Sequence, residues 1–172
     1  MMDGINQSLA RDLDRSFPVV VDIMGARLYW GLRRISGNHQ EAEDLTQETL
    51  IRAYQALAGY DRERIAALSL EPWLWTIAVY LGRNHLRDRA RRPTLVGFEE
   101  TAVSDPEPID TRAWDSRMAE LSGPQRTAVV LRHVVGLGIE EICEITGRPA
   151  GTVKADIHRG LNRLRAIMEE ET

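Results

Sequence analysis

The pattern of apolar residues near the end of the chain constrains the fold most strongly. Residues 139–146 read as a short helix that stops at Gly147, a position suited to the left-handed turn that ends a helix. Beyond it, apolar residues recur at the spacing of one buried face of a long helix; they are Val153, Ile157, Leu161, Leu164 and Met168. A short helix, a tight turn and a long helix form the pattern of a helix-turn-helix motif.

Helical spacing also dominates the first half of the chain. Residues 18–36 are predicted to form a mostly apolar helix opened by Pro18, and a second helix is predicted over residues 40–58. The buried face of the second helix comprises Ala42, Leu45, Thr49, Ala53 and Leu57. A third helix is predicted from Pro72 to about residue 90. Because runs of alternating β-branched residues bounded by turns are hard to find, we expect an all-α protein.

The chain of 172 residues is long enough for two small domains. Residues 93–118 are acidic and include the stretch SDPEPID, which lacks apolar periodicity and predicts a flexible linker. The expected organisation is therefore a helical domain over residues 1–92, the acidic linker, and a helix-turn-helix domain over residues 119–172. The second domain begins with Ser122 and Gln125, which resemble a capping box opening a helix that runs to about residue 135.

Several classes of protein are disfavoured by composition. A single cysteine, Cys143, excludes a disulfide framework within the chain and indicates a reducing compartment. No stretch approaches the roughly 18 apolar residues of a membrane span, and the first residues lack the apolar core of a secretory signal, so we expect a cytoplasmic protein. The histidines lack zinc-site spacing, and no nucleophile elbow, phosphate loop or paired catalytic acids are found. We therefore expect no metal, no cofactor and no enzymatic activity of its own.

The net charge of −4 hides a strong segregation of charge along the chain. Residues 83–93 and residues 148–165 each sum to +4, whereas residues 94–124 sum to −5. Both basic segments fall on predicted helices. Nucleic acid therefore stays a candidate partner despite the acidic average, since local cations decide contacts with phosphate.

The outer face of the last helix suits duplex DNA. In a helix-turn-helix the first turns of the second helix enter the major groove. The residues opposite the buried face supply phosphate-binding cations and groups for base edges; they are Thr152, Lys154, Ala155, His158, Arg159, Asn162 and Arg163, with Arg132 of the preceding helix placed to brace the backbone. A plain solvated face is the usual meaning of a lone basic helix, but the preceding tight turn favours DNA binding here.

The predicted third helix combines aromatic and basic side chains, namely Trp73, Trp75 and Tyr80 followed by Arg83, Asn84, Arg87 and Arg91. Such a mixture suits single-stranded DNA, because stacking on an aromatic ring contributes about 1–3 kcal/mol per base and arginines hold the phosphates. The alternative is a buried core. We favour the core for Trp73, which heads the apolar face, and leave both alternatives open for Trp75 and Tyr80.

A polar stripe on the predicted second helix is not explained by its own buried face. Asp44, Gln47, Glu48 and Ile51 share one face at helical spacing. The stripe is either an ordinary solvated surface or a docking face for a basic partner helix, and composition alone does not choose between them.

Three segments occur in a diagnostic order: AEDLTQETLIRAYQAL, then PWLWTIAVYLGRNHLRDRARR, then LSGPQRTAVVLRHVVGLGIEEICEITGRPAGTVKADIHRGLNRLR. Together they resemble bacterial RNA polymerase sigma factors of the extracytoplasmic-function (ECF) group, a two-domain branch of the sigma-70 family. The resemblance covers most of residues 18–167 apart from the acidic linker. It implies that residues 1–92 correspond to region 2 of the family and residues 119–168 to region 4.

The resemblance also implies partners and a division of roles. The stripe at Asp44, Gln47 and Glu48 would grip the clamp coiled coil of the polymerase β′ subunit. The loop before Pro72 and the helix after it would open the minus-ten promoter element and hold an everted base, and the helix-turn-helix would bind the minus-thirty-five element as duplex. An anti-sigma factor is an expected further partner, and no cofactor is implied.

The chain departs from the family pattern at three places. Tyr80 stands where members usually have asparagine, which leaves open the base held in the pocket. After GTVK the family commonly shows serine and arginine, whereas this chain has Ala155 and Asp156; we expect an altered minus-thirty-five preference, since an acid facing phosphate repels it. The loop between Tyr60 and Trp73 is long and apolar, which favours a short helix of its own.

Two rival functions remain open from the sequence. An autonomous helix-turn-helix regulator, with a sensing or dimerising first half, would leave the basic, aromatic helix over residues 72–92 unexplained. An adaptor that sequesters polymerase or another regulator would use the stripe at Asp44 without melting DNA.

Overall fold

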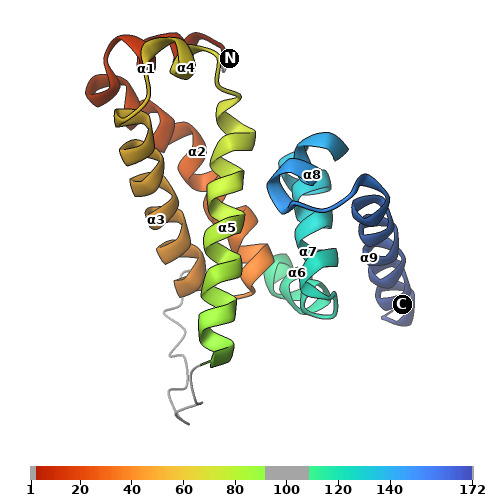
Figure 1. Ribbon diagram of the computed structural model, residues 1–172. Helices are drawn as coiled ribbons and strands as arrows, with labels where there is room; N and C mark the ends of the chain where they lie inside the picture. Colours follow the sequence, from red (N-terminus) through yellow and green to blue (C-terminus); the bar gives the residue numbers. More distant parts are fainter. Residues whose placement is uncertain (1–2, 92–108, 172) are drawn as a thin grey trace.

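The computed structural model describes residues 3–91 and 109–171, and every regular element within these ranges is a helix (Figure 1). The first range forms a helical bundle of α1 (Asp3–Arg11), α2 (Leu13–Ser36), α3 (His39–Ala58), α4 (Arg62–Ala66) and α5 (Leu70–Arg91). The second forms a C-terminal lobe of α6 (Ile109–Ala119), α7 (Gly123–Val129), the π-helical turn η1 (Val130–Val135), α8 (Ile139–Thr146) and α9 (Ala150–Glu170). The prediction of an all-α fold is confirmed. Of the linker predicted over residues 93–118, residues 93–108 lie outside the described residues.

The long helix α2 begins earlier than its sequence suggested. Asp12 caps it by accepting a hydrogen bond from the backbone N–H of Arg15 at 3.1 Å, so the helix starts at Leu13 and Pro18 lies inside it. Its end agrees with the prediction. Gly37 adopts a left-handed conformation with φ of 74°, and its N–H bonds to the carbonyl of Arg33.

The centre of the bundle is set by α2, α3 and α5. All five apolar or small residues predicted for the inner face of α3 are buried. Trp75 of α5 is fully buried, and its ring lies so close to Gly31 of α2 that a Cβ on that glycine would sit 2.3 Å from Trp75 Cη2. Close packing of α2 on α5 therefore requires glycine at position 31.

Three further short helices are α1, α4 and α6. The apolar loop after Tyr60 contains α4, as its composition favoured. Sequence periodicity did not indicate α1, which is fixed by the burial of Ile5 and Leu9. Nor was α6 expected, since its residues fall within the predicted flexible linker; Met118, one turn after Trp114, is buried in the lobe's own apolar cluster.

The helix-turn-helix prediction is confirmed, with one correction to the buried face. Gly147 has φ of 67° and turns the chain from α8 into α9. Val153, Ile157 and Leu164 are buried as predicted, but Met168 is 44% exposed and Asp156 and Gly160 are buried instead. The difference arises because a helix of 3.6 residues per turn places Asp156 and Gly160 beside that face.

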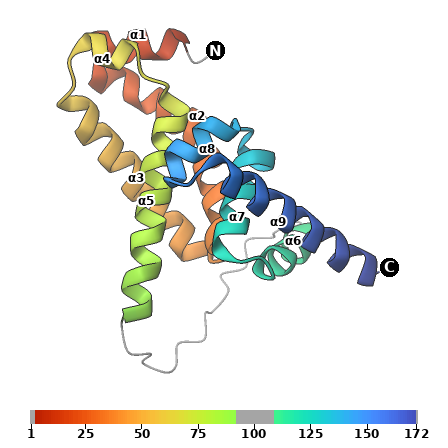
Figure 2. The ribbon, with the colours of Figure 1, turned by 45° about the vertical axis from the view of Figure 1, so that its right-hand side comes forward.

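The C-terminal lobe packs directly against the bundle. Helix α8 lies along α5, while α7 and η1 contact α2, and α9 extends away from the bundle (Figure 2). Buried apolar residues of both parts, including Leu74 in α5 and Ile142 in α8, belong to one continuous cluster. An ion pair between Arg33, near the C-terminal end of α2, and Asp115 of α6, at 2.8 Å, also joins the two parts. Within the described ranges, no helix combines the length and the apolar character needed to span a bilayer.

Candidate nucleic-acid interface

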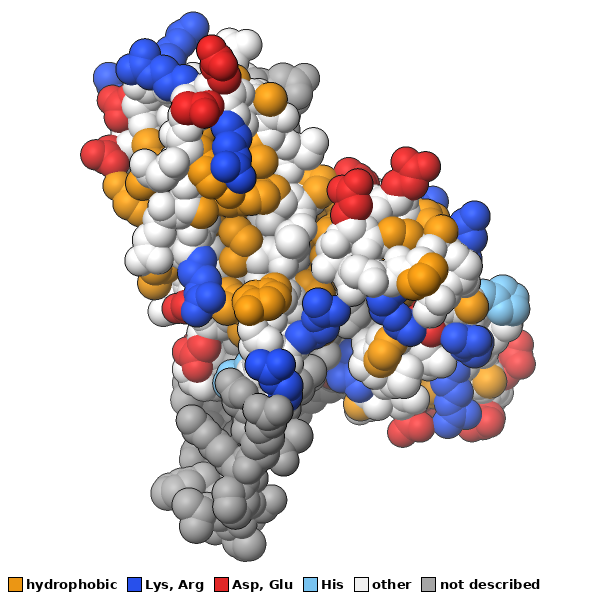
Figure 3. All heavy atoms as spheres, viewed as in Figure 1, with side chains coloured by type: hydrophobic (Ala, Val, Ile, Leu, Met, Phe, Trp, Pro, Cys, Tyr) orange, Lys and Arg blue, Asp and Glu red, His pale blue; other side chains and the backbone are white. Residues whose placement is uncertain are grey.

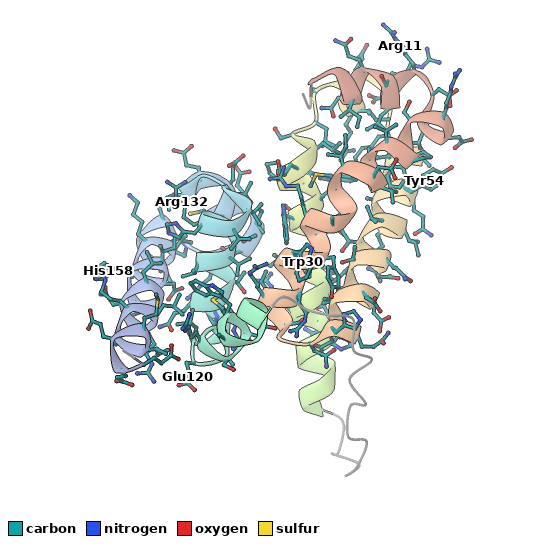
Figure 4. All side chains as sticks on the ribbon, turned by 180° about the vertical axis from the view of Figure 1, so that it is seen from behind. Arg11, Trp30, Tyr54, Glu120, Arg132 and His158 are labelled. Atoms are coloured by element: carbon teal, nitrogen blue, oxygen red, sulfur yellow. The ribbon has the colours of Figure 1, made fainter. Side chains whose placement is uncertain are left out.

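The outer face of α9 carries the predicted duplex-binding residues together. Lys154, His158, Arg159 and Arg163 are exposed, while Thr152 and Ala155 are half-buried at its start. Figure 4 shows His158 on the side of the lobe that faces away from the bundle. Lys and Arg side chains gather over the lobe in Figure 3. The arrangement places cations and a ring donor on one accessible helix face, as groove binding requires.

Arg163 of α9 and Arg132 of η1, both predicted DNA contacts, also make contacts within the lobe. Arg163 donates to Glu120 Oε2 at 3.1 Å, but both side chains are about half exposed, so the pair is weak and solvent-screened. Arg132 donates to the carbonyl of Leu137 at 2.9 Å and thereby braces the loop between η1 and α8. Arg132 is thus tied to its own loop, with its side chain still exposed at the surface.

The expectation that Asp156 faces DNA phosphate is wrong. Its carboxylate is buried and accepts hydrogen bonds from Arg148 Nη1 and from Arg159 Nη2, the latter at 2.9 Å. Arg148, in the turn before α9, was not among the predicted site residues. The signal that could have found it is the presence of one acidic residue among five basic ones in residues 148–165.

The predicted minus-ten residues on α5 have very different surroundings. Trp75 is a core residue, which corrects its proposed role in base stacking, because its fully buried ring cannot meet a base. Trp73 is half-buried against the Tyr60 ring, at 6.1 Å between centroids, whereas Tyr80 is 54% exposed. The remaining members are Arg83 and Arg87, both exposed, Asn84, which is half-buried, and Arg91, whose side chain lies outside the described residues.

Arg83 is committed to the C-terminal lobe. Its Nη1 donates to the carbonyl of Thr146 at 2.9 Å. That carbonyl belongs to the last residue of α8, where helix carbonyls lack intrahelical partners. One predicted DNA contact of α5 thus caps the helix that precedes the helix-turn-helix turn.

A cavity of about 550 Å³ lies beside the loop that precedes α5. Its walls comprise residues 66–72, Asn6 and Gln7 of α1, and Glu141 of α8. Asn6 donates to the carbonyl of Leu68 at 2.5 Å, while its own Oδ1 is buried without a hydrogen-bond partner among the described residues. Tyr80 is not among the walls of this cavity.

The stripe on α3 is accessible. Asp44 and Gln47 are exposed, Ile51 is 52% exposed, and Glu48 pairs with Arg52 at 2.6 Å. Figures 1 and 2 both show α3 on the side of the bundle away from the C-terminal lobe. Further along the same helix, Tyr54 donates to Asp14 Oδ1, and this hydrogen bond raises the pKa of Tyr54. The stripe thus stays accessible to a partner while the C-terminal lobe is packed against the bundle.

Arginines that sequence reasoning did not single out hold the two parts together. Arg126 of α7 donates to the carbonyls of Ile35 at 3.2 Å and Leu121 at 3.0 Å, and burial lowers the pKa of Arg126. Arg27 of α2 donates to the carbonyl of Val135 at 3.3 Å. Because the acceptors are backbone carbonyls, which every residue has, no pattern of residue types predicts these contacts. Across the described residues, no cluster of three His, Cys, Asp or Glu residues could hold a metal ion.

Comparison with known proteins identifies the family. Residues 21–92 match sigma-70 region 2, and residues 111–164 match sigma-70 region 4. The ECF RNA polymerase sigma factor SigW of Bacillus subtilis is 30% identical over 172 residues, which cover 90% of each chain. This chain belongs to the ECF sigma factors. The resemblance seen in the sequence is confirmed, and the sigma factor directs transcription initiation; nothing in the comparisons favours an autonomous regulator.

Other relatives agree with this assignment. ECF RNA polymerase sigma factor SigE of Mycolicibacterium smegmatis is 36% identical over 156 residues, which cover 85% of this sigma factor and 59% of that one. The sigma factor RpoE of Bartonella quintana, solved with the anti-sigma factor NepR, has a TM-score of 0.72 at 24% identity, covering 89% and 96% of the two chains. CnrH, solved with the cytosolic domain of CnrY, has a TM-score of 0.73 at 20% identity, covering 99% and 98%. At these identities the two structures show the shared fold.

Proposed function

We propose that this sigma factor uses three surfaces, one to bind core polymerase and two to recognise the promoter. The α3 stripe binds core polymerase, α5 with its preceding loop captures the unpaired minus-ten strand, and α9 binds the minus-thirty-five element as duplex. The observation that carries the proposal is the exposed cationic face of α9 directly behind the turn at Gly147. An exposed helix in that position is the element that enters a major groove.

The α3 stripe suits a basic coiled coil as its partner. Asp44 and Glu48 supply negative charge, and the exposed side chain of Ile51 supplies an apolar contact at the end of the same face. Charge complementarity directs association, while the apolar residue adds area that loses water on binding. The clamp coiled coil of the polymerase β′ subunit is the partner we assign to it.

The loop and N-terminal half of α5 suit capture of an extruded base. Pulling a base out of the stack costs on the order of a few kcal/mol, which contacts in a pocket have to offset. The cavity lined by residues 66–72 is large enough for a base. The exposed ring of Tyr80 and the cation of Arg87 lie further along the same helix for the adjoining strand.

We also propose an anti-sigma factor as a regulatory partner and the cytoplasm as the site of action. RpoE and CnrH, which share the fold of this chain, were each solved in complex with a partner, in the case of RpoE an anti-sigma factor. Because core polymerase and promoter DNA are the partners proposed here, the protein has to meet both in the same compartment.

Run-off transcription tests the proposal. The full chain is mixed with core polymerase and genomic DNA fragments, and the run-off transcripts are sequenced. We expect defined start sites that share two upstream elements. Polymerase binding without transcripts would instead support the adaptor function. Duplex binding without any association with polymerase would contradict the proposal outright.

A further inference from the structure

Asp156 is a charged residue inside the buried face of α9. Its side chain is only 5% exposed, although it lies on the helix proposed to bind duplex DNA. A buried carboxylate is strongly disfavoured unless cations and hydrogen-bond donors surround it. The two arginines that contact it are therefore essential to its presence there.

These two arginines come from different structural elements. Arg148 lies in the turn, directly after Gly147 and before Pro149, the N-cap residue of α9. Arg159 lies on α9 itself, three residues beyond Asp156. The carboxylate thus joins the turn of the helix-turn-helix to the helix that follows it.

The exposure of the three side chains is graded from inside to outside. The carboxylate is enclosed, whereas Arg148 is 33% exposed and Arg159 is 59% exposed. Only Nη1 of Arg148 and Nη2 of Arg159 bond to Asp156. Since a guanidinium group carries five N–H donors, each arginine keeps donors for a ligand at the surface.

We propose that Asp156 is a positioning residue that fixes Arg148 and Arg159 for contact with the minus-thirty-five duplex, and that Arg148 is itself a DNA contact. This inference rests on the proposed function of α9. A long side chain that is already ordered loses less conformational entropy when it binds, so fixing both arginines favours one register on the groove. The specific complex gains more from this order than random duplex does, because random duplex accepts many placements of a cation.

The alternative is that Asp156 acts only as a negative charge near DNA. The two roles predict different results for Asp156→Asn. Removing a repelling charge would strengthen binding to every duplex, whereas removing a positioning contact lowers the preference for the promoter over other sequences. The ratio of the two affinities therefore separates the two roles.

The test uses the full chain assembled with core polymerase and a promoter mapped by run-off transcription. Affinity is measured for that promoter and for the same duplex with a scrambled upstream element. The variants are Asp156→Asn, Arg148→Gln and their combination. Matched controls are Glu144→Gln, which removes an exposed acid from α8, and Arg165→Gln, which removes an exposed cation from α9.

Each single variant is expected to lower the ratio of promoter to scrambled affinity about tenfold, and the combination to lower it by less than the product of the two single effects, since Asp156 acts in part through Arg148. Each control is expected to change both affinities alike. Asp156→Asn removes the negative charge and one of the two acceptor oxygens, so thermal unfolding is recorded for each variant. Arg148→Gln leaves the carboxylate charged and paired with Arg159, so it is the variant expected to disturb the fold less.

Two results would overturn the inference while leaving the function of α9 intact. One is a folded Arg148→Gln variant with an unchanged affinity ratio. The other is stronger binding of Asp156→Asn to both duplexes, in parallel with Glu144→Gln. If the unsubstituted protein in complex with polymerase fails to distinguish the two duplexes, the proposed function of α9 is wrong and the inference falls with it.

Discussion

The two cationic helices, α5 and α9, differ in what their cations contact. On α5, Arg83 bonds to the carbonyl of Thr146, and one side of the helix packs against α8. On α9, Lys154 and His158 face outward, and the helix extends away from the bundle (Figure 2). Arg83 thus joins the two parts of the protein, whereas Lys154 and His158 remain at an open surface. In the packed arrangement, the proposed duplex-binding face is accessible while part of the proposed strand-binding helix is occupied by the protein itself.

The largest expected effect sharpens the division between the core and the surface of α5. Trp75→Ala is expected to lower the free energy of unfolding by roughly 3–5 kcal/mol, because it removes a fully buried ring. The matched change Tyr80→Ala removes an exposed ring from the same helix and is expected to alter stability by no more than about 0.5 kcal/mol. Urea unfolding measures both. A similar loss for the two variants would contradict the assignment of Trp75 to the core.

A second prediction separates polymerase binding from duplex binding. The double change Asp44→Ala with Gln47→Ala is expected to weaken binding to core polymerase at least about tenfold, since central interface residues dominate affinity. Binding of the isolated chain to duplex DNA is expected to stay unchanged, because α3 lies on the far side of the bundle from the lobe. Fluorescence anisotropy with each ligand provides the measurement. Equal losses for both ligands would break the division of roles.

The salt dependence of duplex binding tests whether the open face of α9 is the electrostatic surface. Lys154→Ala or Arg159→Ala is expected to reduce the slope of log affinity against log salt by about one, because one phosphate contact and its counterions are lost. Arg62→Ala, an exposed cation on α4, serves as the control. A slope that stays the same in the α9 variants would show that other cations hold the phosphates.

The smallest effect concerns the contact between the two parts. Arg83→Ala removes the donor to the carbonyl of Thr146 and is expected to cost about 1 kcal/mol of local stability at the end of α8. Hydrogen exchange of the amides in α8 and in the turn at Gly147 would show it as faster exchange. Arg87→Ala removes the next exposed arginine of α5 and should leave that exchange unchanged.

Local patterns were enough to predict much of the fold, because they depend on neighbours a few residues apart. The inner face of α3 and the succession of α8, Gly147 and α9 are of this kind. Helices α1 and α6 were not predicted, because α6 has almost no apolar periodicity and α1 offers only Ile5 and Leu9, which are buried by packing against distant residues.

The candidate site was predicted less completely than the fold. Its outward cations follow from helical periodicity, but the burial of Asp156 depends on Arg148, which lies in another element. The prediction that Asp156 faces DNA phosphate placed this acid at the surface and was therefore wrong. Trp75 was ambiguous for a related reason, since only the close approach of Gly31 shows which side of α5 meets α2.

Arg126 favours the packed arrangement because it bonds to carbonyls of both parts of the protein. Its guanidinium is shared between Ile35, in the last turn of α2, and Ala119 and Leu121 at the end of α6 and just beyond it. Such terminal carbonyls carry the negative end of the helix dipole. Drawing the lobe away from α2 would strip this cation of one acceptor and expose it to solvent at once. A carboxylate or phosphate would then replace the Ile35 carbonyl as the acceptor for Arg126. Anionic ligands should therefore favour the separated form more than neutral ligands do.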